Sequence, residues 1–265
     1  MSSLDALINK VWQQDCFETL KAIPSGSIDC VITDPPYGTT SFDYDEKSKS
    51  LDMKAWFAEI LRVAHDKTPI LIFASGKFTY RMIDIGQKYF RYEMVWDKVK
   101  TATGMLDANI KPLRNHEYVL YFSKTFDRYS KKYPHKTCNT FNHGVLIDKN
   151  NIKRNPNRFM VYGEDSRCFY TKLNDAQYPR SILKFNKSMN HKLRIHPNEK
   201  PLALITYLVN LYSNPGNLVF DPFAGSANVA YACIENKRRF ICCELDEKFY
   251  NLATKRLNDK LQYEV

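Results

Sequence analysis

One short stretch limits the possible folds of this chain more than any other. Residues 27–38 read SIDCVITDPPYG. The run 28–32 is apolar at four of its five positions, as in a strand buried on both faces, and Pro35 and Pro36 cannot continue a strand ladder. The pattern predicts that Asp34 lies at the carboxyl end of a parallel strand, which is the edge where open α/β sheets bind ligands.

The two prolines also limit what this loop offers to a ligand. Each fixes φ near about −65° and lacks an N–H, so the loop carbonyls and the Asp34 carboxylate present hydrogen-bond acceptors only. Such a loop suits a substrate amino group. The alternative is an ordinary turn, since Pro, Asp and Gly are common in turns.

A second stretch, NLVFDPFAGSAN at 217–228, predicts another buried strand followed by a tight turn at Gly225. A helical pattern covers 229–235, and a third apolar strand ends on Glu244, nineteen residues after the glycine. This is how a βαβ unit holds an adenosine: the backbone approaches at the glycine and the carboxylate takes the ribose hydroxyls. Because the phosphate-binding Gly-x-Gly-x-x-Gly is missing, a nucleoside without phosphates is favoured over a dinucleotide.

DPPY, DPFAGSAN, the ELD strand end and HPNEKP at 196–201 together resemble the S-adenosyl-L-methionine-dependent DNA amino-methyltransferases. DPPY precedes the glycine turn, an order similar to that of the β class, whose target-recognition region lies between the two. The resemblance covers about residues 10–123 and 196–260. It implies an α/β fold with a doubly wound, mostly parallel, seven-stranded Rossmann-like sheet, a circularly permuted motif order and a recognition insertion.

The resemblance also implies a division of the chain and a set of site residues. The expected parts are a catalytic half at 1–123, a basic recognition insertion at 124–195 and a cofactor half at 196–265. The expected catalytic residues are Asp34, Pro35, Pro36 and Tyr37. The expected cofactor-binding residues are Asp15, Cys16, Asp34, Asn198, Lys200, Asp221, Phe223, Ala224, Gly225, Ser226, Asn228, Glu244 and Leu245. The expected DNA-binding residues are Lys98, Lys131, Lys132, Lys153 and Arg154.

The chemistry implied is methyl transfer to the exocyclic N6 of a flipped adenine in DNA. Asp34 and the Pro35 carbonyl would accept hydrogen bonds from the two N–H groups of the amino group, and Tyr37 would stack on the extruded base. N4-cytosine methylation is the nearest alternative, although those enzymes commonly carry Ser in place of Asp34. Methylation of RNA or of a protein glutamine amide, and a basic nucleic-acid-binding module without catalysis, are the others.

Two motifs depart from the family pattern. Ala227 and Asn228 stand where the usual FxGSGTT has Gly and Thr, and Asn198 and Glu199 stand where HPTQKP is common. Alanine at a helix start has no steric cost unless its φ is positive or the cofactor touches it. We expect the first departure to tune the site without abolishing it.

The positive charge is confined to one segment. The chain has a formal net charge of +10, and residues 124–194 alone hold sixteen Lys and Arg against five Asp and Glu. The remainder has twenty-three against twenty-four, so it is nearly neutral. Ten aromatic residues lie within 126–190, where no helical pattern is convincing. The segment therefore favours a nucleic-acid surface, although its aromatics would also suit a small core.

The remaining features bound the class of protein. At 265 residues the chain can form one sizeable α/β domain with an insertion. No signal-peptide pattern or membrane-spanning run is found, so a cytoplasmic protein of prokaryotic or phage origin is expected. Seven cysteines without a CxxC pair indicate reduced, mostly buried thiols, and no metal site is expected. A cognate restriction endonuclease is a candidate partner, and the chain could be a monomer or a homodimer.

Loops and elements around the site complete the prediction. Helices are expected at 53–63, 78–90 and 202–212, and a mobile polar loop over the site at 38–50. A second loop at 98–115 lies between two strands and could close on flipped DNA. His116, just after that loop, could serve the site or be a satisfied core histidine.

Overall fold

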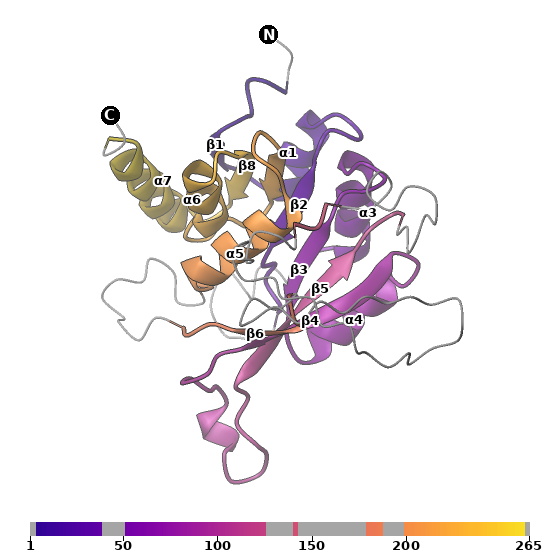
Figure 1. Cartoon of the computed structure of the whole chain (residues 1–265), viewed down its shortest axis with the longest axis vertical. Helices are drawn as coiled ribbons and strands as arrows, with labels where there is room; N and C mark the ends of the chain where they lie inside the picture. Colours follow the sequence, from indigo (N-terminus) through magenta and orange to yellow (C-terminus); the bar gives the residue numbers. More distant parts are fainter. Residues whose placement is uncertain (1–3, 39–50, 126–139, 143–178, 188–198, 263–265) are drawn as a thin grey trace, which may run out of the picture.

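The computed structural model describes residues 4–38, 51–125, 140–142, 179–187 and 199–262. Within these ranges, one eight-stranded sheet has the order β1-β8-β7-β2-β3-β5-β4-β6 (Figure 1). The strands are β1 (Lys10–Gln13), β2 (Cys30–Thr33), β3 (Ile70–Ala74), β4 (Phe90–Asp97), β5 (His116–Phe122), β6 (Ile182–Lys184), β7 (Leu218–Asp221) and β8 (Arg239–Glu244). All neighbours pair in parallel except that β5 is antiparallel to β3 and to β4.

The described helices form a layer on each face of this sheet. One face carries α1 (Cys16–Ala22), α3 (Met53–Val63) and α4 (Lys77–Ile85). The other carries α5 (Leu202–Tyr212), α6 (Asn228–Glu235) and α7 (Glu247–Gln262). Figure 1 shows the second group, in orange and yellow, apart from the first in indigo and purple. The predicted doubly wound α/β fold is confirmed.

The central strands are apolar on both sides because helices cover both sides. In β2, Ile32 packs in the cluster under α5 and α6, whereas the preceding Val31 packs in the cluster under α1 and α3. In β3 the same alternation sends Leu71 to one cluster and Ile72 to the other. Successive strand side chains point to opposite faces, so a doubly covered strand must be hydrophobic at every position.

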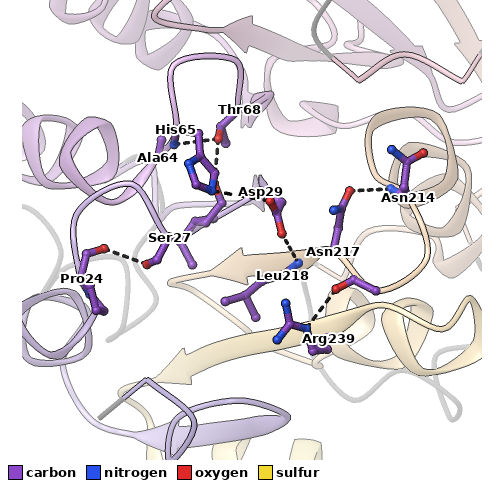
Figure 2. Close-up of polar contacts among 12 residues, drawn as sticks. Pro24, Ser27, Asp29, Ala64, His65, Thr68, Asn214, Asn217, Leu218 and Arg239 are labelled. Carbon is purple, nitrogen blue, oxygen red and sulfur yellow. Dashed lines mark hydrogen bonds and ion pairs between the residues drawn. The ribbon is translucent and has the colours of Figure 1, made fainter. Parts of the chain in front are cut away.

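The pairing of β2 with β7 joins two segments far apart in the chain, and it is fixed at the amino ends of both strands. Asp29 Oδ2 accepts a hydrogen bond of 2.7 Å from the Leu218 N–H, and its Oδ1 lies 3.6 Å from His65 Nε2 (Figure 2). The Thr68 hydroxyl donates to the Ile28 carbonyl at 2.7 Å. Parallel strands fixed at one end bring their other ends to the same edge, so Asp34 and Asp221 are neighbours in space.

The sheet differs from the prediction by one strand. Seven strands come from the two expected halves of the domain, and the eighth, β6, comes from the expected insertion and pairs with β4. The sequence did not indicate it, because β6 has three residues and buries only Leu183 at a sheet edge. Helix α4 ends at Ile85, earlier than the expected Phe90, because Gly86 caps it. A side chain at Gly86 would collide with the ring of Phe122, since a Cβ there would lie 2.5 Å from it.

Two further expectations concern the described residues. The five cysteines they contain, at positions 16, 30, 233, 242 and 243, are all free and buried, as expected. Among these same residues, no helix combines the length and apolar character needed to cross a membrane.

Candidate active site

A cavity of about 910 Å³ lies at the carboxyl edge of the parallel strands. The loop after β2 lines it with Asp34 and Tyr37, and the turn after β7 lines it with Phe223 and Gly225. The end of β8 adds Glu244. The two stretches singled out in the sequence therefore face one shared space.

Asp34 is held by hydrogen bonds at both carboxylate oxygens. Oδ2 lies 2.7 Å from Lys200 Nζ, and Oδ1 accepts a hydrogen bond of 2.7 Å from the Tyr37 hydroxyl. Its side chain is 27% exposed, so a ligand in the cavity can reach it. Pro35, next to it, is buried. The carboxylate is thus fixed in orientation while remaining open to the cavity.

Lys200 also belongs to a row of alternating charges. Its Nζ lies 3.0 Å from Glu117 Oε2, and Glu117 Oε1 lies 2.7 Å from Lys98 Nζ. The side chains of Lys200 and Lys98 are 8% and 3% exposed, so both ammonium groups are shielded from water. Two acids and two lysines alternate along it, so each charge has an opposite neighbour, as buried charges require.

The pKa values in the row follow from burial opposed by the neighbouring charge. Burial raises the pKa of Glu117, but the ammonium groups of Lys200 and Lys98 outweigh it and bring the pKa down to about 2. Burial raises the pKa of Asp34 above its usual range, while Lys200 and the Tyr37 hydroxyl work in the opposite direction. Burial alone would lower the pKa of Lys200, yet Asp34 and Glu117 raise it above its usual value. Lys200 is therefore a permanent cation beside Asp34.

Tyr37 is fixed on one side by another ring. Its ring stacks on Phe78 with centroids 4.8 Å apart and an interplanar angle of 24°. Lys200 Nζ lies 5.6 Å from the centroid of Tyr37. The hydroxyl is directed to Asp34, so Tyr37 contributes both an aromatic surface and a hydrogen bond to the acid.

The glycine turn and Glu244 form the second half of the cavity. Glu244 Oε2 accepts a hydrogen bond of 2.8 Å from the Gly225 N–H, and Oε1 accepts one of 2.9 Å from the Asp246 N–H. Burial raises the pKa of Glu244, and these N–H bonds oppose the rise. Each carboxylate oxygen has two lone pairs, so Glu244 can still accept bonds from a ligand's hydroxyl groups.

Asp221 is a buried acid between these two halves. Its Oδ1 accepts hydrogen bonds from the Thr33 hydroxyl at 2.9 Å and from the Phe223 N–H at 3.1 Å. Burial, together with the charges of Asp34 and Glu244, raises the pKa of Asp221 to about 7, while the two hydrogen bonds oppose the rise. Three acids thus face one cavity, which favours a ligand that carries positive charge.

Comparison with known proteins decides the family. Residues 28–255 match the N6_N4_Mtase family, described as DNA methylase. The chain belongs to the DNA methylases. Membership confirms the family predicted from the sequence, methyl transfer to DNA and the use of S-adenosyl-L-methionine as methyl donor.

Individual relatives are similar along nearly the whole chain. The type II methyltransferase M1.MboII of Moraxella bovis is 25% identical over 264 residues, which cover 95% of this chain and 97% of the relative. The DNA adenine methyltransferase YhdJ of Escherichia coli K12 is 25% identical over 260 residues, covering 94% of this chain and 82% of the relative.

Two solved structures share the fold of this DNA methylase. The M1.HpyAVI–SAM complex is 21% identical and has a TM-score of 0.61. The match covers 94% of this chain and 98% of the chain in the complex. The cytosine-N4-specific PvuII DNA methyltransferase is 16% identical and has a TM-score of 0.65. The match covers 93% of this chain and 85% of the other.

Most of the residues predicted for the DNA methylase site line one cavity. These are Asp15, Cys16, Asp34, Pro35, Pro36, Tyr37, Lys200, Asp221, Phe223, Ala224, Gly225, Ser226, Asn228, Glu244 and Leu245. Asn198, Lys131, Lys132, Lys153 and Arg154 lie outside the described residues. Lining the cavity is consistent with the predicted roles, which stay predictions.

Three predicted residues have partners that the sequence did not indicate. Lys98 was expected to contact DNA, but its side chain is 3% exposed and its ammonium binds Glu117, so it cannot reach a phosphate in this arrangement. Asp15 caps α1, its Oδ1 accepting from the Phe17 N–H at 2.8 Å. Asn228 donates to the Lys200 carbonyl at 2.7 Å and accepts from Arg256 at 2.6 Å, so its amide is a structural clamp.

Ala227, the main departure from the family's glycine turn, meets the condition under which alanine has a cost. Its φ is 56°, in the left-handed region, and it is the residue that caps α6. A glycine adopts that conformation freely, whereas alanine does so at some expense. The methyl group is completely buried, which offsets part of this cost.

Glu117 is the site residue that sequence reasoning missed. From the sequence, its neighbour His116 is a candidate and Glu117, which is the second residue of strand β5, is not. His116 stacks edge-on against Tyr118 and its Nδ1 lies 3.4 Å from Asn115 Oδ1, whereas Glu117 lines the cavity. A charged residue inside an otherwise apolar strand was the available signal, because such a residue needs a partner.

Proposed function

We propose that this DNA methylase transfers the methyl group to the exocyclic N6 of adenine, with Asp34 as the residue that orients the amino group. The observation that carries the proposal is the fixed, cavity-facing carboxylate of Asp34 beside the Pro35 and Pro36 backbone. An N4-cytosine enzyme of this family commonly carries Ser at that position. The similarity to an Escherichia coli relative named as a DNA adenine methyltransferase also supports adenine.

The cavity fits an adenosyl sulfonium in size and in donor set. S-adenosyl-L-methionine, when bound, supplies an electrophilic methyl group. The two oxygens of Glu244 would hold the ribose hydroxyls, and apolar side chains such as Phe223 and Phe249 would enclose the adenine. The carboxylate of Asp34, and that of Asp221 when it is ionised, favour a cationic ligand by simple charge attraction.

Asp34 would prepare the target nitrogen for the transfer. An exocyclic amine is a poor nucleophile because its lone pair is conjugated into the ring. By accepting hydrogen bonds from its two N–H groups, Asp34 and the Pro35 carbonyl would pull the nitrogen toward tetrahedral geometry and free that lone pair. The nitrogen then forms its bond to the methyl carbon as the carbon–sulfur bond breaks, and Asp34 can hold the proton that the nitrogen loses.

The basic segment 124–195 is our proposed DNA-contact region, and it rests on charge alone. Its lysines and arginines lie largely outside the described residues. A cognate restriction endonuclease is also proposed, because the relative from Moraxella bovis is named as a type II methyltransferase. We propose that the chain acts as a monomer or a homodimer.

Product analysis tests the assignment. DNA from a host without base methylation is incubated with the protein and S-adenosyl-L-methionine, digested to nucleosides and examined by mass spectrometry. The expected product is N6-methyladenine. N4-methylcytosine would move the target to cytosine, and unmodified DNA would overturn the proposal.

Asp34→Ala is the matched variant for that experiment. It should lower turnover by at least about 10²-fold, the cost typical of removing one positioned polar group. Folding should survive, since Lys200 keeps Glu117 as its partner. More than a tenth of wild-type turnover, in a variant with unchanged circular dichroism, would exclude Asp34 from the chemistry.

A further inference from the structure

An exposed apolar tip stands at the end of the hairpin formed by residues 98–115. Of the eleven exposed large hydrophobic residues among the described positions, five lie in this hairpin. Met105 is 69% exposed, Leu106 is 102% exposed and Ile110 is 83% exposed. Figure 1 shows the hairpin, in pink, projecting from one end of the molecule away from the layers of the sheet. Three neighbouring apolar side chains with so little cover indicate a binding function.

The tip is an ordered structure. Gly104, with a φ of 94°, begins the short 3-10 turn η2 (Met105–Asp107). The Asp107 carbonyl accepts from the N–H groups of Ile110 and Lys111, both at 3.0 Å. The Asp107 carboxylate also pairs with the Lys111 ammonium at 2.5 Å. The backbone is closed on itself, so the apolar side chains are held outward by a defined turn.

The base of the hairpin is part of the candidate active site. Thr103 and Arg114 pair through backbone hydrogen bonds of 2.9 and 3.0 Å, and both line the cavity. Arg114 Nη1 donates to Ser75 Oγ at 2.8 Å. The first residue of the hairpin, Lys98, joins the charge row that ends at Asp34. The tip is therefore connected, through a short paired stem, to the space where the target base would lie.

The stem carries the charge expected next to DNA. Lys100, Lys111 and Arg114 are exposed cations, and Asp107 at the tip pairs with Lys111. Leucine, isoleucine and methionine are the side chains that DNA-bending proteins insert between base steps, where they replace part of the lost stacking. Extruding one base from a duplex leaves such a gap and costs unstacking energy.

We propose that Met105, Leu106 and Ile110 form an apolar wedge that enters the DNA stack beside the target base and lowers the cost of extruding it. The inference rests on the proposed methylation of a flipped base. A second copy of the chain is a poorer fit, since a stable protein interface buries roughly 1,200–2,000 Å² and three side chains on a narrow tip offer far less. A wedge needs only one or two side chains.

The test compares a paired and an unpaired target. The recognition sequence is first read from genomic DNA methylated by the wild-type protein. Two duplexes are then made, one fully paired and one with an abasic site opposite the target base. Because an unpaired base is cheap to extrude, the wedge should matter only for the paired duplex.

The variant is M105S/L106S/I110S, and the control is L252S/L261S, which removes two exposed leucines from α7. The hairpin variant should transfer methyl groups to the paired duplex at least about tenfold more slowly, and to the abasic duplex within about threefold of wild type. The control should match wild type on both. Equal loss on the two duplexes, or no loss on the paired one, would overturn the wedge.

Failure of the proposed function looks different, because genomic DNA exposed to the wild-type protein would then carry no methylated base at the first step. Sedimentation of both proteins completes the test. A wild-type dimer that the hairpin variant converts to a monomer would assign the tip to contact between copies and overturn the wedge. An unchanged state of assembly supports it.

Discussion

Lys200 Nζ lies 2.7 Å from Asp34 Oδ2, and the same ammonium lies 3.0 Å from Glu117 Oε2. The lysine therefore has two carboxylate partners, and both line the cavity, but Asp34 is the more exposed of the two, at 27% against 14% for Glu117. An amino group that reaches Asp34 must share its oxygens with Lys200 and Tyr37 or displace one of them. Glu117 keeps Lys200 paired in either case, so the row can release Asp34 without leaving an uncompensated charge.

Removing the ammonium should change the pH at which the enzyme loses activity. In Lys200→Met the pKa of Asp34 should rise further, because burial remains and the neighbouring cation is gone. A carboxylate is needed to accept hydrogen bonds from the amino group. As the pH is lowered, the variant should therefore lose turnover at a higher pH than wild type does. The pH profile of kcat measures this.

Two controls separate the charge from the side chain. Lys200→Arg keeps the cation and should keep the profile close to that of wild type. Lys260→Met, at the surface pair with Glu235, should leave the profile unchanged. An unshifted acid limb in Lys200→Met would mean that Lys200 does not govern the ionisation of Asp34.

Tyr37 should show two separable contributions. Tyr37→Phe keeps the ring on Phe78 but removes the hydroxyl bonded to Asp34, so substantial turnover should remain, with the acid limb moved to higher pH. Tyr37→Ala should in addition weaken DNA engagement by about 1–3 kcal/mol, the cost of a lost stacking ring. Equal behaviour of the two variants in kcat and DNA affinity would argue against a stacking role.

Asp221 should make the protein less stable as the pH rises toward neutrality. Its pKa is raised from 3.8 to about 7, so the folded state binds more protons than the unfolded state between those values. Stability therefore falls as pH rises through that window, by roughly a few kcal/mol in total. The difference in unfolding free energy between wild type and Asp221→Asn, measured by denaturant titration at several pH values, isolates this effect.

The opposite sign is expected for Glu117. Its pKa is lowered from 4.5 to about 2, so its stabilising effect is complete above pH 4.5 and is lost as pH falls toward 2.

For Asp221, the contrary outcome is a difference in unfolding free energy between wild type and Asp221→Asn that stays constant between pH 4 and 7. Such a result would contradict the raised pKa of Asp221.

Ala227 should tolerate glycine, unlike another buried alanine of the same helix. Ala227→Gly relieves the strain of a left-handed alanine, which stabilises the fold by roughly 1–2 kcal/mol. It also removes a buried methyl group and gives the unfolded chain more freedom, and each of these destabilises the fold by roughly 0.5–1 kcal/mol. The net change should be within about 1 kcal/mol. Ala232→Gly has no strain to relieve and should cost about 2 kcal/mol. Thermal unfolding of both variants gives the comparison, and equal losses would refute it.

Cofactor binding and DNA binding should separate along the chain. Neutralising Lys131, Lys132, Lys153 and Arg154 together should weaken DNA binding and flatten its salt dependence, by about 0.9 in log–log slope for each lost phosphate contact. Affinity for S-adenosyl-L-methionine should hardly change. Glu244→Ala should do the reverse, because it removes the acceptor beside Gly225. An unchanged salt slope in the quadruple variant would exclude these four residues as the phosphate-binding surface.

Local pattern was enough to locate the two halves of the site. Four apolar positions before Pro35 identify a doubly buried strand, and its covering by helices on both faces follows from that. Since parallel strands bind ligands at their carboxyl ends, the position of Asp34 could be inferred without coordinates. Helices α3 and α5 were predicted at their observed bounds because their apolar spacing is regular.

The charge row could not be inferred in this way, because its four members come from separate parts of the chain. Strand β5 runs antiparallel between β3 and β4, so its first residues, including Glu117, lie at the edge where the parallel strands end. That reversal brings Glu117 to Lys200 and buries Lys98, which from its neighbours alone looked like a surface cation. The positive φ of Ala227 is likewise set by how α6 packs after the turn. Residue type and spacing fix which side chains can do chemistry, whereas long-range strand order fixes which of them meet.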